Sequence, residues 1–303
     1  MDSSASIRRA QPLLGTFVEI AAADAAASDP QDAIDAAFGA VAQVHRLMSF
    51  HDPNSDVSRL NRDAPGCVVR VHAWTYQVLA AALELHRNSA GLFDITIAPM
   101  LQKRGLLPRG PTEPAPAADR PTAANVVELL GDDRVRYRDR GVRIDLGGIA
   151  KGFAVDRAVE VLRERGLRRG VVNAGGDLAA FGTRPELVQV RNPNDPRRPL
   201  CQVEIGNAAL ASSGRLFDPF KTGSLADCAI IEPNTGQQVR AVAGATVCAR
   251  CCMIADALTK VVMIAGEGAA QLLRQYRASA FFVLESGNVR ITPDWHDAVR
   301  LAA

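Results

Sequence analysis

The stretch VRIDLGGIAKGFAVDRAVEVL, residues 142–162, decides the fold expected for this chain. Its apolar residues Val142, Ile144 and Leu146 alternate with charged ones, which is the period of a half-buried β-strand. Two glycines follow, and from Val155 onward the apolar residues recur at helical spacing. The stretch therefore predicts a strand that passes into an amphipathic helix through a glycine turn.

A carboxylate, Asp145, lies at this joint between strand and helix. The positive end of a helix favours an anion such as a diphosphate, and Asp145 offers an acceptor to a ribose or amide donor. However, the run matches neither G-x-G-x-x-G nor the P-loop, and the same pattern also occurs without a ligand. On spacing alone, a binding site and a purely structural joint are both open.

Composition limits the class of protein. With 303 residues, 48% of them hydrophobic and 22% charged, the chain is long enough to bury a full core. The net charge of +2 gives no electrostatic case for nucleic acid or an anionic membrane surface. The start, MDSSASIRRAQPLLG, lacks an apolar segment and no later run reaches about 18 apolar residues. We therefore expect a cytoplasmic protein that is not embedded in a membrane and binds its partner in a pocket.

Toward the N-terminus, the patterns predict a strand at residues 13–22 and helices at 32–47 and 73–86. A loop is expected at 48–61, because its centre is Asp-Pro-Asn-Ser. In GLFDITIAPML, Asp94 lies between a glycine turn and an expected short strand. Five of the 17 prolines fall in residues 107–123, which are predicted to form an exposed excursion.

Toward the C-terminus, strands are expected at 170–173, 188–190, 202–205, 208–211 and 238–248. A helix at 253–265 places Asp256 and Lys260 one turn apart. Together these elements predict an α+β protein. Cys67, Cys201 and Cys228 read most simply as small buried hydrophobes, whereas Cys248, Cys251 and Cys252 form a C-x-x-C-C cluster that could bind zinc or be redox active.

Six motifs stand in the order found in ApbE-type FAD:protein FMN transferases, which the chain resembles from about residue 13 to 284. They are LLGT (13–16), GLFD (91–94), IDLGGIAKGFAVD (144–156), NAGGDL (173–178), EPNTG (232–236) and ADAL (255–258). The resemblance implies a single domain over residues 1–303, with two lobes, a T-fold-like core and FAD between the lobes. It also implies Mg²⁺-assisted transfer of FMN through a phosphoester bond onto a Ser or Thr of an acceptor protein, with release of AMP.

The resemblance also assigns residues. It implies that Asp145 contacts FAD, that Lys151 lies near it, that Phe93 and Asp94 contact its adenosine side, and that the loop with Phe50 and His51 covers it. The full set of implied FAD contacts is Leu14, Phe50, His51, Leu92, Phe93, Asp94, Asp145, Lys151 and Asp177. The implied metal ligands are Gly148, through its carbonyl, Asp256 and Thr259, and the implied catalytic residues are Asp256 and Lys260.

Three departures from the family pattern matter. Leu14 replaces a Met, which conserves volume. Ala229 stands where the family usually has a His thought to act as base for the acceptor hydroxyl, and Glu232 replaces the Asp of the following turn. Lys260 stands where a Thr usually helps to bind the metal, with Thr259 beside it.

Lys260 is open to two functional interpretations and one purely structural interpretation. In the first, Thr259 or water completes a weaker Mg²⁺ site. In the second, the Lys260 ammonium, one helical turn from Asp256, takes the place of the cation. The plain alternative is a surface ion pair worth about 0.3–0.5 kcal/mol. FMN transfer is the expected activity, and the alternatives are an FAD-binding protein without transferase activity and an FAD diphosphatase.

Overall fold

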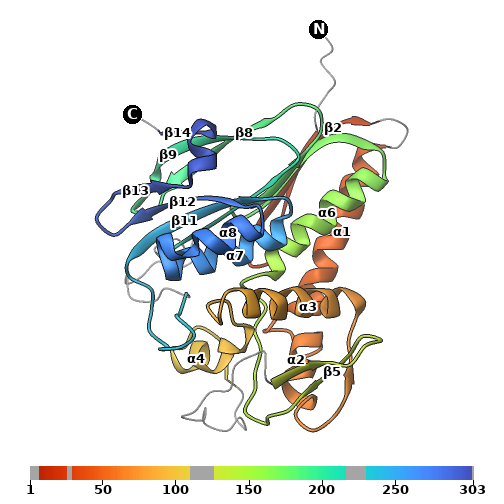
Figure 1. The fold of residues 1–303 in the computed structure, drawn as a ribbon. Helices are drawn as coiled ribbons and strands as arrows, with labels where there is room; N and C mark the ends of the chain where they lie inside the picture. Colours follow the sequence, from red (N-terminus) through yellow and green to blue (C-terminus); the bar gives the residue numbers. More distant parts are fainter. Residues whose placement is uncertain (1–6, 26–28, 110–125, 216–229, 302–303) are drawn as a thin grey trace.

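An eight-stranded antiparallel sheet forms the centre of the computed structural model, which describes residues 7–25, 29–109, 126–215 and 230–301 (Figure 1). Every neighbouring pair of strands in it is antiparallel. In spatial order its strands are β1 (Ile7–Leu13), β2 (Thr16–Ala25), β6 (Leu167–Ala174), β7 (Asp177–Phe181), β10 (Ala209–Gly214), β11 (Val242–Ala249), β12 (Ser279–Leu284) and β13 (Val289–Ile291).

Helices cover one face of this sheet and a second sheet covers the other (Figure 1). The helices are α1 (Pro30–Met48), α6 (Ala150–Glu164), α7 (Cys252–Ala265) and α8 (Ala270–Gln275), with the 3-10 turn η2 (Gly266–Ala269). The second sheet has the order β14 (Val299–Leu301), β9 (Asp195–Ile205), β8 (Glu186–Asn192), and η3 (Pro293–Ala298) precedes β14. Strand β10 shows the alternation, because Ala209 and Ala211 pack with the helices while Leu210 packs toward the second sheet.

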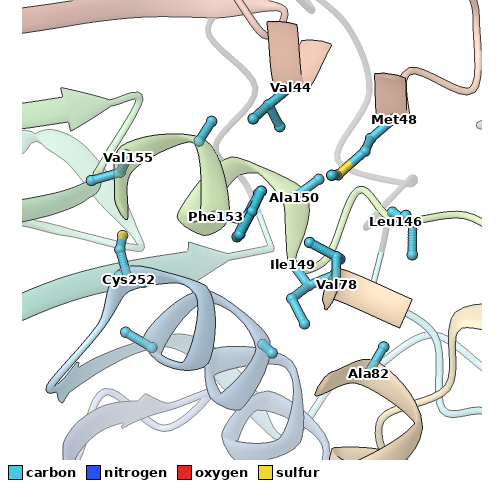
Figure 2. Close-up of a cluster of buried hydrophobic side chains, with 14 of the residues drawn as sticks. Val44, Met48, Val78, Ala82, Leu146, Ile149, Ala150, Phe153, Val155 and Cys252 are labelled. Carbon is cyan, nitrogen blue, oxygen red and sulfur yellow. The ribbon is translucent and has the colours of Figure 1, made fainter. Parts of the chain in front are cut away.

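A smaller group of elements lies beyond the ends of α1 and α6 (Figure 1). It contains α2 (Asp56–Asp63), α3 (Ala73–Asn88), η1 (Ile95–Ile97), α4 (Ala98–Lys103) and a sheet of β3 (Val69–Arg70), β5 (Arg134–Tyr137) and β4 (Val127–Leu129). One cluster of buried side chains continues from the helical layer into this group. Figure 2 shows Val44 and Met48 of α1, Phe153 of α6 and Val78 of α3 in that cluster.

The α+β class is confirmed, and so are most of the expected elements. Helices α1, α3 and α7 and strands β6, β8, β9, β10 and β11 fall at the expected places. Residues 110–125 lie outside the described ranges, so most of the expected proline-rich excursion does too. Among the described residues, no helix has the length and apolar character needed to span a bilayer.

Near the N-terminus, one expectation is confirmed with a later start and one was partly wrong. The strand expected at residues 13–22 is β2, which begins at Thr16, and β1 pairs with it in a hairpin that turns at Leu14 and Gly15, where φ is 57° and 70°. The segment 48–61 is not all loop, because α2 begins at Asp56. The Ser55 hydroxyl caps that helix by accepting a hydrogen bond from the Ser58 N–H at 3.0 Å.

The strand expected at residues 142–146 was also wrong, because the segment is extended but pairs with no strand. A side chain replaces the partner strand: Asn61 accepts from the Ile144 N–H at 2.8 Å and donates to the Ile144 carbonyl at 2.9 Å. The helix that follows begins at Ala150, earlier than Val155. The short strand expected after Asp94 is instead the 3-10 turn η1, capped by the Asp94 carboxylate on the Thr96 N–H at 2.7 Å.

Candidate functional site

Two half-buried lysines and two buried aspartates from three elements meet in one cluster. The Lys151 ammonium on α6 bonds the Asp177 carboxylate at the start of β7, and its Nζ lies 3.9 Å from Asp256 Oδ1 on α7. The Lys260 ammonium bonds the same Asp256 Oδ1 and donates to the Asp256 carbonyl at 3.0 Å. Asp177 is 1% exposed and Asp256 0%. Buried carboxylates need such partners, so the two ammonium groups balance the two acids.

A close approach of α6 and α7 positions this cluster. A Cβ added at Gly152 would lie 2.2 Å from the Cys252 carbonyl oxygen and 2.8 Å from the Asp256 Cβ, so only glycine allows the two helices to come this near. The Gly152 N–H donates to Asp256 Oδ2 at 3.0 Å. One turn further along α6, the Asp156 carboxylate accepts from the N–H groups of Cys252 and Met253 at 2.7 and 2.8 Å, which caps the start of α7.

Burial and neighbouring charge act in opposite directions on this cluster. Burial alone would lower the pKa of the Lys151 ammonium, but the charges of Asp177 and Asp256 outweigh it and hold that pKa above its usual value. Lys151 therefore stays a cation. Burial, with a smaller contribution from Asp256 and Glu160, raises the pKa of Asp156 to about 6, although two N–H groups bond it.

A cavity of about 230 Å³ opens beside the cluster. Lys260 of the cluster lines it, together with Gly148, Phe93, Asp94 and Asp145. Burial raises the pKa of Asp145 against the opposing effects of the Gly147 and Leu146 N–H groups and of His51. The lining of the cavity thus combines apolar side chains with one ammonium and two carboxyl groups, so it offers a small-molecule ligand both apolar and polar contacts.

The wall with Phe93 and Asp94 is held in place by hydrogen bonds. Asp94 Oδ1 accepts from the Thr96 N–H and hydroxyl, both at 2.7 Å, and its Oδ2 lies 3.9 Å from His86 Nδ1. The same His86 nitrogen lies 2.9 Å from the Phe93 carbonyl oxygen. Phe93 and Asp94 are only 5% and 6% exposed, so the wall is largely built before any ligand binds.

The structure brings together most, but not all, of the residues assigned from the sequence. Leu92, Phe93, Asp94, Asp145, Gly148 and Lys260 share the cavity, and Lys151, Asp177 and Asp256 form the adjoining cluster. Leu14, Phe50 and His51 line neither described cavity. The Leu14 N–H donates to His45 Nδ1 at 3.2 Å, and Phe50 and His51 are edge-on neighbours with ring centroids 6.4 Å apart.

Sequence reasoning missed the roles of Gly152, Asp156 and Ser213. Gly152 precedes Val155, where the helical pattern was expected to begin, so its place in α6 and its close contact with α7 were not predicted. The pairings of Asp156 and Ser213 do not follow from local spacing, because their partners lie 96 and 46 residues away along the chain.

Two of the three implied Mg²⁺ ligands, Asp256 and Thr259, are already engaged with protein groups. Asp256 Oδ1 is bonded by Lys260 and Oδ2 by the Gly152 N–H. The Thr259 hydroxyl is fully buried, donates to the Asp256 carbonyl at 2.6 Å and lies 2.7 Å from the Ser213 hydroxyl of β10. Within the described ranges, no three His, Cys, Asp or Glu side chains gather as a metal site. This arrangement does not fit a divalent ion at Asp256.

Of the two remaining motif departures, only Glu232 lies within the described residues. Ala229 falls outside the described residues. Glu232 caps its own turn, accepting from the Thr235 hydroxyl at 2.6 Å. Burial raises the pKa of the thiols of Cys248 and Cys251 to about 11 and that of Cys252 well above its usual value, so these thiols suit packing better than metal binding. Cys201 is buried as expected, but the expectation for Cys67 was wrong, because Cys67 is exposed; Cys228 lies outside the described residues.

A larger cavity of about 550 Å³ lies on the opposite face of the main sheet, toward β8 and β9. Its lining includes the polar side chains of Asn173, Ser212 and Thr246. Phe17, which is 62% exposed, also lines it. No residue assigned from the sequence lines this cavity.

Comparison with known proteins matches the chain to one family. The model of the ApbE family matches residues 14–282. The FAD:protein FMN transferase of Vibrio cholerae is 26% identical over 236 residues, covering 74% of this chain and 71% of the relative. That of Haemophilus influenzae is 26% identical over 267 residues, covering 82% and 77%.

Solved structures agree. The ApbE protein from Thermotoga maritima superposes with a TM-score of 0.85 at 26% identity, covering 97% of this chain and 99% of that one. The flavinyl transferase ApbE of Pseudomonas stutzeri in its apo form gives a TM-score of 0.82 at 22% identity, covering 98% and 99%, and supports the fold alone.

Proposed function

Because the chain belongs to the ApbE family, we propose that it is an FAD:protein FMN transferase that moves FMN from FAD onto a Ser or Thr of an acceptor protein. In this reaction the acceptor hydroxyl oxygen forms a bond to the phosphorus of the FMN half. The bond from that phosphorus to the bridging oxygen breaks, and AMP leaves with the electron pair. The hydroxyl proton passes to a base or to solvent.

The observation that carries the proposal is the contact between the ion cluster and the cavity. Lys260 belongs to both, so an ammonium held by Asp256 lines a cavity that Phe93 and Asp94 also line. An FAD with its adenosine at Phe93 and Asp94 would bring its diphosphate to Lys260. Asp145 would accept a hydrogen bond from the cofactor, and Lys151 and Asp177 would fix the position of Asp256.

The acceptor is proposed to be a protein with an accessible Ser or Thr, and nucleic acid is not expected as a partner. The cytoplasm remains the predicted location, and subcellular fractionation tests it. The whole chain is proposed to act as one domain, since one buried cluster joins the main sheet to the group that contains α2, α3 and α4.

The test is incubation with FAD and a panel of candidate acceptor proteins, with and without Mg²⁺. Intact-mass spectrometry should show the mass of FMN added to an acceptor, and chromatography should show an equal amount of AMP. Tryptic peptides should place the added mass on Ser or Thr.

Ala229 makes two other outcomes informative, because it stands where the family usually has a catalytic His. Release of free FMN with AMP would identify an FAD diphosphatase that uses water as the acceptor. Tight FAD binding with no product would identify a flavin-binding protein that has lost the transferase activity. Either result would replace the proposed function.

A further inference from the structure

We propose that the Lys260 ammonium is the built-in counter-charge of this site, so that FAD binds without a divalent cation. The inference rests on the proposed function for the identity of the ligand. It concerns which positive group faces the diphosphate, and it has a test that does not require FAD.

The position of the ammonium is the first support. It bonds the Asp256 carboxylate and donates to the Asp256 carbonyl at 3.0 Å, so two oxygens of one residue hold it. The lysine stem passes beside Gly148, where an added Cβ would lie 3.6 Å from the Lys260 Cε. The side chain is 19% exposed and lines the cavity. A cation held in this way is fixed before the ligand arrives, which is the arrangement that favours binding of an anion.

The second support is that both carboxylate oxygens of Asp256 already have partners within the protein. Its two carboxylate oxygens are bonded by Lys260 and by the Gly152 N–H, and the Lys151 ammonium lies 3.9 Å from Oδ1. A divalent cation at this carboxylate would have to displace one ammonium and would be repelled by the other. Thr259 does not provide a free metal ligand, because its hydroxyl donates to the Asp256 carbonyl and lies beside the Ser213 hydroxyl.

The choice of residue is the third support. The chain contains 35 lysines and arginines, and only four of them are lysines. Two of the four lysines, Lys151 and Lys260, belong to this cluster. An ammonium is a compact point charge with three donors, whereas a guanidinium is a planar fork that needs more room. A compact charge is what a site requires where the side chain takes the place of an ion.

The first experiment needs no FAD. Calorimetric titration of the wild-type protein with MgCl₂ should give no saturable binding, and MgCl₂ should leave its melting temperature unchanged. For Lys260→Thr, which frees Asp256 Oδ1 and adds a hydroxyl, MgCl₂ should raise the melting temperature. Saturable Mg²⁺ binding by the wild type with a rise in its melting temperature would overturn the proposal.

The second experiment measures FAD affinity by fluorescence titration in excess chelator and in MgCl₂. The wild type should have the same Kd within about twofold in both. Lys260→Met keeps the length of the stem but removes the charge, and should weaken binding by about tenfold to a hundredfold, the usual range for a hydrogen bond to a charged group. Lys103→Thr, which removes an exposed lysine at the end of α4, serves as the control and should leave the Kd unchanged.

The outcomes separate the two proposals. A wild type whose FAD affinity falls tenfold or more in chelator would overturn the role of Lys260 while leaving FMN transfer intact. A folded wild type that binds no FAD in either buffer would overturn the proposed function, and the Mg²⁺ titration would then decide the role of Lys260. If the Lys260 variants do not fold, the two wild-type measurements decide it without them.

Discussion

The side chain of Asn61 acts as a partner strand for Ile144. It accepts a hydrogen bond from the Ile144 N–H at 2.8 Å and donates one to the Ile144 carbonyl at 2.9 Å, and the two residues are 83 positions apart. Asn61 is 8% exposed and Ile144 0%, so water does not replace these bonds. One amide therefore fixes the extended segment that carries Asp145.

Asn61→Ala should destabilise the fold. It leaves a buried N–H and a buried carbonyl without partners, and each such group costs about 1–3 kcal/mol. Urea unfolding should show a lower midpoint. Asn88→Ala is the matched control, because Asn88 is exposed and its side chain donates a hydrogen bond to the Tyr276 hydroxyl at 2.9 Å. Equal midpoints for Asn61→Ala and the control would contradict this role of Asn61.

Gly152→Ala should be more harmful than another glycine-to-alanine change in a helix. The new methyl group would lie 2.2 Å from the Cys252 carbonyl oxygen and force α6 and α7 apart, and overpacking of this kind typically costs about 1–3 kcal/mol. In α1, an added Cβ at Gly39 meets nothing within 4 Å, so Gly39→Ala should stabilise by about 0.5–1 kcal/mol. Melting temperatures should move in opposite directions for the two variants.

Asp156 should make stability depend on pH between about 4 and 6. Burial raises its pKa from 3.8 to about 6 in the folded protein, so the folded state binds the proton more tightly than the unfolded state does. Stability from this group is therefore greatest below pH 4, falls as the pH rises, and changes no further above pH 6. A shift of about two pKa units corresponds to about 3 kcal/mol.

Asp156→Asn should remove that dependence. The free energy of unfolding of the variant, relative to wild type, should increase from pH 4 to pH 7 by up to about 3 kcal/mol. Asp32→Asn, an exposed first-turn change on α1, is the control. Parallel pH profiles for wild type and Asp156→Asn would show that Asp156 does not titrate in this range.

Asp145→Ala should weaken FAD binding without unfolding the protein. A hydrogen bond from the ligand to a charged group contributes about 1.5–3 kcal/mol, so the Kd should rise by about tenfold to a hundredfold. Asp63→Ala removes an exposed carboxylate that pairs with Arg62, and should leave the Kd unchanged. Equal affinity of Asp145→Ala and wild type for FAD would place Asp145 outside the binding site.

Periodicity predicted the helices well because each buries one continuous face, as α1 does through Ile34, Phe38 and Val41. It failed at residues 142–146, where alternation was read as a strand. Alternation reports which side chains are buried, and Val142, Ile144 and Leu146 are buried indeed. It cannot report what the backbone bonds to, and here the partners are a side chain and the Ile95 carbonyl.

The cluster could be predicted only as separate motifs. Asp256 and Lys260 lie one helical turn apart, so their pairing follows from local spacing. The bond between Lys151 and Asp177 joins α6 to β7, and the contact of Gly152 with Asp256 joins α6 to α7. Those contacts depend on how the helices pack on the sheet, which no local pattern in one sequence specifies.

A backbone hydrogen bond joins the two segments of the cavity lining that carry Asp94 and Asp145. The Asp145 N–H bonds the Ile95 carbonyl at 2.8 Å, directly after Asp94, so the two carboxylates cannot separate without breaking that bond. Lys260 and Ile264 of α7 line the same cavity. A movement of the segment that carries Asp145 would therefore be passed to the neighbour of Asp94 through a single backbone hydrogen bond.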